Sequence, residues 1–142
     1  MVKSKRILIE CCPISNEVLR LTSSVKAHPL PALLARGVAC CLCNDDPGVL
    51  GYGTSGVTHD FWQALQGWEN LGLEGLGSLA ENSVRWASFE DQDAKQWNKD
   101  VADGRYGQGI RAERMRQWVN EWNEFCEWIV VTFAIEYGGG VD

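Results

Sequence analysis

The sequence predicts an α/β protein in which two parallel strands are covered by helices. Two short runs, residues 6–12 and 37–43, are apolar without alternation, which is typical of strands buried on both faces. A helical segment lies between them, and residues 58–137 carry apolar side chains at helical spacing. A strand, a helix and a second strand in this order form a βαβ unit with parallel strands and a right-handed crossover.

The first strand is expected to end at Pro13, because proline cannot donate a hydrogen bond to a neighbouring strand. Residues 16–21 are interpreted as a short helical turn or loop. Residues 31–36 are expected to form the crossover helix, with Gly37 as its left-handed C-terminal cap. The second strand follows at once and ends in the polar residues 44–47.

Several helices are expected after the second strand, preceded by a loop at residues 48–57. Thr58 is expected to cap the first of them and Asp91 the third, because both side chains accept hydrogen bonds from a first helical turn. The last helix is predicted from apolar residues at i, i+3, i+4 and i+7 between Met115 and Phe133. The seven tryptophans lie mostly on these helices and are interpreted as core packing rather than as a ligand-stacking surface.

These elements are expected to form one incomplete domain across residues 1–142. Residues 7–57 make up the two strand-and-helix units, residues 58–137 a helical C-terminal segment, and residues 138–142 a tail. Two parallel strands alone leave two unpaired edges, an arrangement that rarely stands by itself. The sequence therefore predicts that further strands belong upstream of Met1.

Charge and hydropathy exclude several classes of partner. The net charge is -6 and the lysines and arginines do not cluster, which argues against binding to a nucleic-acid backbone. The apolar run at residues 128–135 is far shorter than the roughly 18 residues that suggest a membrane span. The basic first residues are not followed by the apolar core and cleavage pattern of a signal peptide.

Six cysteines raise the alternatives of disulfides or a metal site. In a strand, Cys41 and Cys43 share one face and Cys40 points to the other, so these three thiols do not readily surround one ion. The favoured interpretation is that the cysteines are small buried hydrophobic residues in a reduced chain. A disulfide or metal role remains the alternative.

Asp45 and Asp46 are the strongest candidates for site residues. They follow the second strand directly, and parallel α/β proteins place functional residues at the carboxyl ends of their strands. Aspartates before a proline also commonly form turns and helix caps, and spacing alone favours that structural interpretation. The functional alternative is that neighbouring strand residues point to opposite sides, so that one aspartate holds a metal and the next faces a substrate.

Four further polar residues are candidates for a place in the same site. Glu10 and Asn16 flank the end of the first strand, and their favoured roles are a solvent-exposed charge and a helix cap. His28 and His59 are far apart in the sequence and are interpreted as cap or surface residues, with metal binding as the alternative. The motifs of phosphate loops, serine hydrolases, zinc proteases and cytidine deaminases are absent from the sequence.

Several short motifs together resemble one known family. Residues 10–16, Glu-Cys-Cys-Pro-Ile-Ser-Asn, are followed by His28-Pro29, Gly37-Val38 and Asp45-Asp46-Pro47. In this order and spacing they resemble the last two strand-and-helix units of adenosine deaminases. The resemblance extends from Ile7 to about Trp128 and is closest to the adenosine deaminase growth factor subgroup, including its fungal members.

The resemblance implies a fold and a reaction. The family has a zinc-dependent TIM (β/α)₈ barrel that converts adenosine and water to inosine and ammonia. This chain is then the C-terminal portion of such a barrel, with its last two parallel strands followed by several helices. By the same comparison, Asp45 is a catalytic zinc ligand that orients the attacking water, and Asp46 binds the purine ring of adenosine or 2′-deoxyadenosine.

The sequence departs from the family in what it lacks. The family's zinc-binding histidines, its His-x-His pair included, and its proton-transferring glutamate and histidine lie on earlier strands and have no counterpart here. The chain is therefore expected to hold Zn²⁺ only weakly and to be inactive alone, with an upstream barrel fragment as a partner. Whether it is an enzyme by itself is left open, and the alternative is a non-enzymatic interaction module that uses the Trp-rich C-terminal helix.

The cellular compartment is also left open. The resembled subgroup is secreted, but this chain shows no signal peptide, and such a signal belongs to the N-terminal part of a complete protein.

Overall fold

The computed structural model describes residues 6–51 and 53–137. The chain divides into two compact units, Met1–Trp86 and Ala87–Asp142, and each is described by itself.

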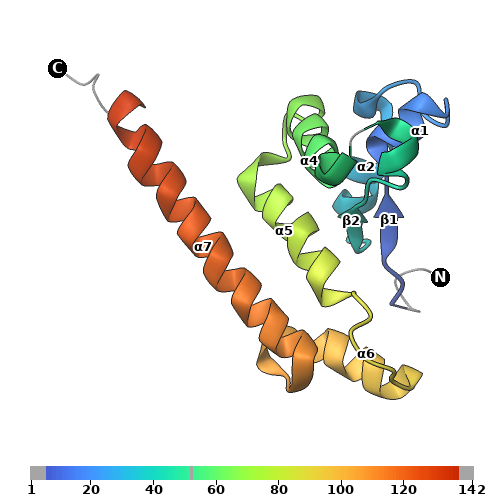
Figure 1. Ribbon diagram of the computed structural model, residues 1–142, viewed down its shortest axis with the longest axis vertical. Helices are drawn as coiled ribbons and strands as arrows, with labels where there is room; N and C mark the ends of the chain where they lie inside the picture. The colour runs from blue at the N-terminus through green and yellow to red at the C-terminus, as the bar shows by residue number, and fades with distance from the viewer. Residues whose placement is uncertain (1–5, 52, 138–142) are drawn as a thin grey trace. The chain divides into compact units, whose positions relative to one another are not determined.

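Two short parallel strands form the centre of the first unit (Figure 1). Strand β1 spans Ile9–Cys11 and strand β2 spans Cys40–Leu42, and Glu10 lies opposite Cys41 in their register. The pairing continues past the end of each strand, because the Cys43 N–H donates to the Cys11 carbonyl over 2.8 Å. The prediction of two parallel strands is confirmed, although regular strand geometry covers only part of each apolar run.

The crossover between the strands contains α1 (Pro13–Val18), the 3₁₀ turn η1 (Val25–Ala27) and α2 (Leu30–Ala35). Helix α2 matches the predicted crossover helix, and Gly37 has a φ of 67°, as expected for a left-handed cap. Its N–H donates to the Leu34 carbonyl over 2.8 Å, which ends the helix. Helix α1 begins earlier than predicted, because Pro13 fits the first helical position, where no N–H is needed.

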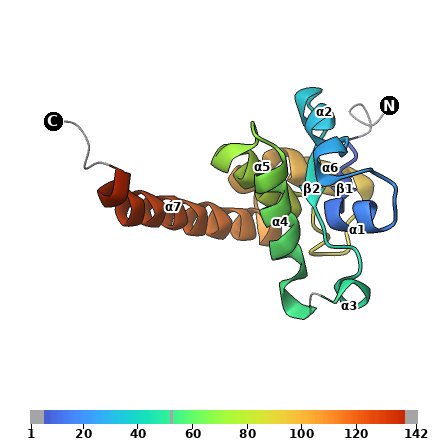
Figure 2. The same ribbon diagram turned by 90° about the horizontal axis from the view of Figure 1, so that it is seen from above.

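The second strand leads into α3 (Pro47–Leu50), the turn η2 (Gly53–Ser55), α4 (Gly56–Gly67) and α5 (Gly72–Arg85). Figure 2 shows α3 and the start of α4 at the same end of this unit. The predicted loop at residues 48–57 is therefore partly helical. The prediction that Thr58 caps α4 is wrong, since the helix begins two residues earlier at Gly56.

The core of the first unit lies between the strands and helices α2, α4 and α5. It is made of buried apolar residues from all of these elements: Cys11, Val25, Leu30, Cys40, Leu42, Ala64, Trp68 and Leu79. The Asn82 side chain fastens α5 to β2, since its Nδ2 donates to the Cys40 carbonyl over 2.9 Å. All six cysteines are free thiols, and three of them are buried, as the favoured interpretation predicted.

The second unit contains α6 (Ala94–Asp103), the turn η3 (Gly104–Tyr106) and α7 (Gly109–Tyr137), the long helix in Figure 1. Asp93 caps α6 by accepting a hydrogen bond from the Gln96 N–H over 2.8 Å. The prediction that Asp91 is this cap is wrong by two residues. The buried Arg111 guanidinium donates to the Ala87 carbonyl over 2.7 Å and lies over the Phe89 ring.

Aromatic rings follow one another along α7. The Trp118 and Trp122 rings stack at 5.6 Å between centroids, and the Phe125 and Trp128 rings stack at 6.0 Å. Phe125 is 42% exposed, Trp128 55% and Phe133 40%. The prediction of core packing is therefore wrong for this part of α7 and for Trp62 on α4, which is 58% exposed, whereas it holds for Trp68. Within the described residues, none of the helices combines the length and apolar character that crossing a bilayer requires.

The burial of the strand cysteines leads to a testable prediction. Burial raises the pKa of the Cys11 and Cys12 thiols to about 12, since the charged thiolate loses its hydration. A thiol with this pKa has roughly 10³-fold less thiolate at pH 8 than an ordinary one. We expect iodoacetamide to alkylate Cys11 far more slowly in the native chain than in the same chain in guanidinium chloride, as measured by peptide mass spectrometry. Equal rates in the two states would contradict this packing.

Candidate functional site

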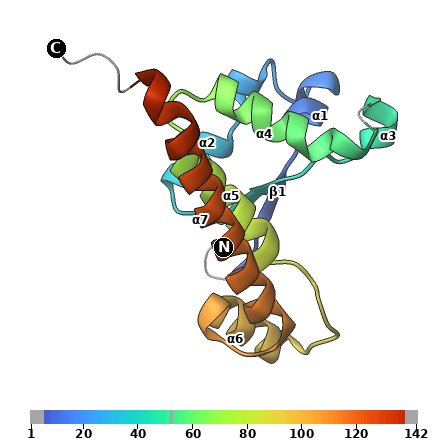
Figure 3. The same ribbon diagram turned by 60° about the vertical axis from the view of Figure 1, so that its left-hand side comes forward.

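The carboxyl ends of β1 and β2 bring Ser15 and Asp45 together. The Ser15 hydroxyl donates a hydrogen bond to Oδ2 of Asp45 over 2.8 Å. Ser15 is buried on α1, just after the first strand, whereas Asp45 is exposed. Figure 3 shows β1 running toward α1 at this end of the unit. The Asp45 carboxylate is therefore held from the protein side and remains accessible from solvent.

The backbone at Asp45 has a φ of 70°, in the left-handed region. Aspartate adopts this conformation more readily than most residues that have a side chain, because its short polar side chain can form local hydrogen bonds. Strand β2 has ended at Leu42, so the alternation of strand side chains does not operate at Asp45 and Asp46. That part of the functional argument from sequence is wrong. Asp45 instead lies in a left-handed turn, and its neighbour Asp46 is the N-cap of α3.

Asp46 caps α3. Its Oδ1 accepts a hydrogen bond from the Val49 N–H over 3.4 Å, and Pro47 occupies the first position of the helix. The structural interpretation of an aspartate before a proline is thus confirmed for Asp46. The side chain is exposed, and the cap occupies only one of its two oxygens in this hydrogen bond.

A buried carboxylate that the sequence analysis missed lies beneath this edge. Asp60 on α4 has an exposed fraction of 0%. Its Oδ1 accepts a hydrogen bond from the Ile14 N–H over 3.2 Å, and its Oδ2 accepts one from Asn44 Nδ2 over 2.6 Å. Burial raises the pKa of Asp60, and these two hydrogen bonds oppose the rise.

The sequence did contain a signal for Asp60. Gly56, Asp60 and Ala64 are spaced four residues apart and form the buried face of α4. An acidic residue between two small residues at this spacing stands on the face that packs against the strands. The prediction of α4 from its aromatic residues overlooked that face.

His28 and Asn16 form a second buried polar contact. The Leu30 N–H donates to His28 Nδ1 over 3.1 Å, so this ring nitrogen carries no proton. The proton is therefore on Nε2, which donates to Oδ1 of Asn16 over 2.9 Å. His28 is buried rather than at the surface, but it is the C-cap of η1, so the predicted cap role is confirmed. Asn16 lies within α1 rather than capping it. Burial lowers the pKa of His28.

Glu10 and His59 are both exposed, as their favoured interpretations predicted. Across residues 6–51 and 53–137, no group of three or more histidine, cysteine, aspartate or glutamate side chains is placed to hold a metal ion. Asp45 offers a single carboxylate, whereas catalytic zinc normally has three protein ligands. The described residues of this chain therefore do not make a zinc site on their own.

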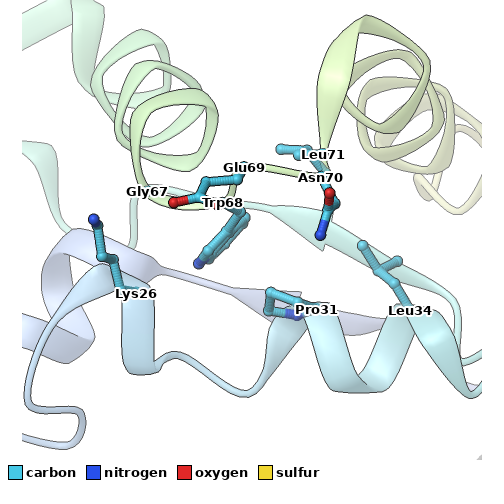
Figure 4. A pocket seen from close by; sticks show the side chains of 8 residues that line it. All are labelled: Lys26, Pro31, Leu34, Gly67, Trp68, Glu69, Asn70 and Leu71. Atoms are coloured by element: carbon cyan, nitrogen blue, oxygen red, sulfur yellow. The ribbon is translucent and has the colours of Figure 1, made fainter.

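A cavity of about 420 Å³ lies elsewhere in the first unit (Figure 4). Trp68 and Leu34 supply its apolar lining, and Lys26 and Glu69 stand at its edge. It also includes Gly67 at the end of α4, and a helix of 12 residues is about 18 Å long. The cavity is thus separated from Asn44, which contacts the first turns of α4, and it does not belong to the aspartate site.

Comparison with known proteins identifies one family. The family model described as adenosine deaminase matches residues 1–103. Adenosine deaminase 2 of Sus scrofa is 35% identical over 109 residues, which cover 70% of this chain and 21% of that protein. Adenosine deaminase 2 of Dictyostelium discoideum is 31% identical over 134 residues, which cover 94% of this chain and 21% of that protein.

A solved structure is also similar. The crystal structure of adenine deaminase from Arthrobacter aurescens matches with a TM-score of 0.53 and 31% identity, covering 70% of this chain and 29% of that one. This similarity confirms the predicted fold class, the C-terminal part of a TIM barrel with two parallel strands and several helices. The chain spans about a fifth of the length of the curated relatives it matches. The fungal subgroup is not tested by these matches and stays a prediction.

The buried His28 leads to a prediction about pH. Its pKa is lowered in the folded chain, so below pH 6.5 the unfolded chain takes up a proton more readily and the free energy of unfolding falls. A protonated Nδ1 would also face the Leu30 N–H, donor against donor. We expect urea unfolding to show a larger loss of stability between pH 7.5 and pH 5.0 for the natural chain than for His28→Gln, which does not titrate. The same loss in both chains would rule out this role.

Proposed function

The chain belongs to the adenosine deaminase family, and on this premise we propose that it forms the last two strand-and-helix units of a zinc-dependent deaminase. The reaction converts adenosine or 2′-deoxyadenosine and water to inosine or 2′-deoxyinosine and ammonia. The family match over residues 1–103 is the observation that carries the proposal. The parallel pairing of β1 and β2 supports it, because the aspartates then follow the carboxyl end of a barrel strand.

Asp45 is proposed to serve as one zinc ligand within a complete barrel. Its exposure supports this role, as does the Ser15 hydroxyl that holds Oδ2 and so orients the carboxylate. When bound, zinc lowers the pKa of a water molecule toward neutrality. In a complete barrel the Asp45 carboxylate would also accept a hydrogen bond from that water and orient it.

Asp46 is proposed to bind the purine. A carboxylate accepts a hydrogen bond from a ring N–H, and this contact fixes the orientation of a base relative to the reacting carbon. Asp46 accepts the capping hydrogen bond through Oδ1 alone, and its side chain is exposed. This accessibility supports a role in selecting the productive substrate pose.

A second candidate function rests on the exposed aromatic rings of α7. This helix begins at Gly109, beyond the residues that the family model matches, and Trp128 is more than half exposed. A non-enzymatic interaction module would use this surface to bind a partner. A stable metal-free complex with an unrelated protein would favour it, whereas zinc binding and inosine formation with an upstream barrel fragment would favour the deaminase.

The deaminase proposal predicts that activity appears only in a complete barrel. We expect the purified chain to form no inosine from adenosine in the presence of zinc. A chimera in which this chain replaces the matching segment of the Dictyostelium discoideum relative should form it, as measured by the loss of adenosine absorbance. Asp45→Asn should lower kcat/KM by at least roughly 10²-fold, since even an outer-shell partner of a metal ligand can contribute that much.

The matched control is Glu69→Gln, which removes a carboxylate at the distant cavity and should leave kcat/KM unchanged. Zinc content and circular dichroism show whether each chimera is loaded and folded. Inosine formation by the purified chain alone, or an Asp45→Asn chimera as active as the control, would overturn the proposal.

A further inference from the structure

We propose that Asp60 is a positioning residue that fastens the ends of the two strands together and so holds Asp45 in place. The importance of this role for catalysis rests on the proposed function of Asp45. The contacts themselves can be tested without reference to zinc or adenosine.

Asp60 binds the immediate neighbours of the Ser15–Asp45 pair. Its two oxygens accept hydrogen bonds from the backbone of Ile14 and from the side chain of Asn44. Ile14 precedes Ser15 and Asn44 precedes Asp45, while Ser15 donates directly to Asp45. Together with the backbone, these hydrogen bonds form a closed ring that joins Asp60 on α4 to the segments that directly follow β1 and β2. These two segments are called the strand exits. A shift of either exit would break at least one of these hydrogen bonds.

The side chain of Asn44 is fixed on two sides. Its Nδ2 donates to Asp60, and its amide packs against Gly56, one helical turn earlier on α4. A Cβ atom at Gly56 would lie 2.7 Å from Asn44 Cγ and 2.8 Å from Pro47 Cβ, closer than real Cβ atoms come. Gly56 is therefore needed here for its small size. Because Gly56 has no side chain, the Asn44 amide has room to reach Asp60, and Asn44 is followed directly by Asp45.

The orientation of this amide follows from its chemistry. Among the described residues, Asn44 Oδ1 is buried and has no hydrogen-bond partner. The reverse orientation would place that oxygen against the Asp60 carboxylate, acceptor against acceptor. The Asp60 carboxylate therefore determines which way Asn44 points. An apolar residue at position 60 would leave both the Nδ2 group and the Ile14 N–H unpaired in a buried place.

Asp60 does not act as a catalytic residue itself. Its exposed fraction is 0%, and each of its oxygens already accepts a hydrogen bond. A substrate would meet Asp45 and Asp46, which are exposed. Asp60 influences that surface only through Ile14 and Asn44, as expected of a residue that positions others.

The test compares Asp60→Leu with the exchanged pair Asn44→Asp/Asp60→Asn in the full 142-residue chain. A leucine at position 60 has a similar size but accepts no hydrogen bond, so it leaves the Ile14 N–H and Asn44 Nδ2 without their acceptor. In the exchanged pair, the side-chain oxygen at position 60 accepts from Ile14, and the side-chain nitrogen there donates to the new carboxylate at position 44. We expect the single substitution to break the ring and the exchange to restore it.

Two NMR measurements report on the ring. In Asp60→Leu, the Ile14 amide should exchange with solvent at least roughly tenfold faster, the factor that corresponds to one lost hydrogen bond. The nuclear Overhauser contact between the Ser15 and Asp45 side chains should weaken. Both signals should return in the exchanged pair. The control is Leu79→Ala, which destabilises the same core but should keep the Ser15–Asp45 contact while the chain is folded.

Unchanged Ile14 exchange and an intact Ser15–Asp45 contact in folded Asp60→Leu would overturn the proposal. A folded exchanged pair that lacks them would do the same. If Asp60→Leu does not fold, the exchanged pair gives the result alone: native exchange and contact support the proposal, and an unfolded chain contradicts it. Because no readout depends on activity, failure here is distinguishable from failure of the deaminase assignment.

Discussion

The exits of two parallel strands must be held together for the exposed aspartates to keep a defined geometry. In this chain a single buried carboxylate does so, since Asp60 accepts one hydrogen bond from each exit. Burying a charge is costly, and the cost is tolerated where hydrogen bonds satisfy the group. The left-handed backbone at Asp45 and the hydrogen bond from Ser15 lie directly beside this closure. The buried Asp60 therefore positions the exposed surface that a substrate would meet.

The two strands gain further support from the helices around them. Strands of three residues have little ladder energy of their own, so the core contacts of α2, α4 and α5 must hold them. The same helices supply polar anchors, including Asn82 to the carbonyl of Cys40. His28 adds an anchor within the crossover through Asn16. A part of a barrel thus carries its own arrangement of strand ends.

Sequence patterns predicted what depends on local order along the chain. The apolar runs predicted the strands, Gly37 predicted the end of α2, and the order of elements predicted parallel pairing. Exact caps were missed, because several residues near each helix start have suitable side chains and only tertiary packing selects one. Asp93 rather than Asp91 is the example in α6.

Contacts between distant segments could not be predicted from spacing. Asp60 and Ile14 are 46 residues apart, and Ser15 and Asp45 are 30 apart, so no periodicity links them. The burial of the α7 rings was overestimated, because helical spacing shows which residues share a face but not what covers that face.

The Asp45 carboxylate, held through Ser15, is proposed to be a metal ligand, and anomalous X-ray diffraction from zinc-loaded crystals of the chimeric barrel can locate the metal. We expect a zinc ion within about 2.0–2.2 Å of an Asp45 carboxylate oxygen. A zinc ion bound by other side chains, with Asp45 turned away from it, would show that this carboxylate is not a ligand.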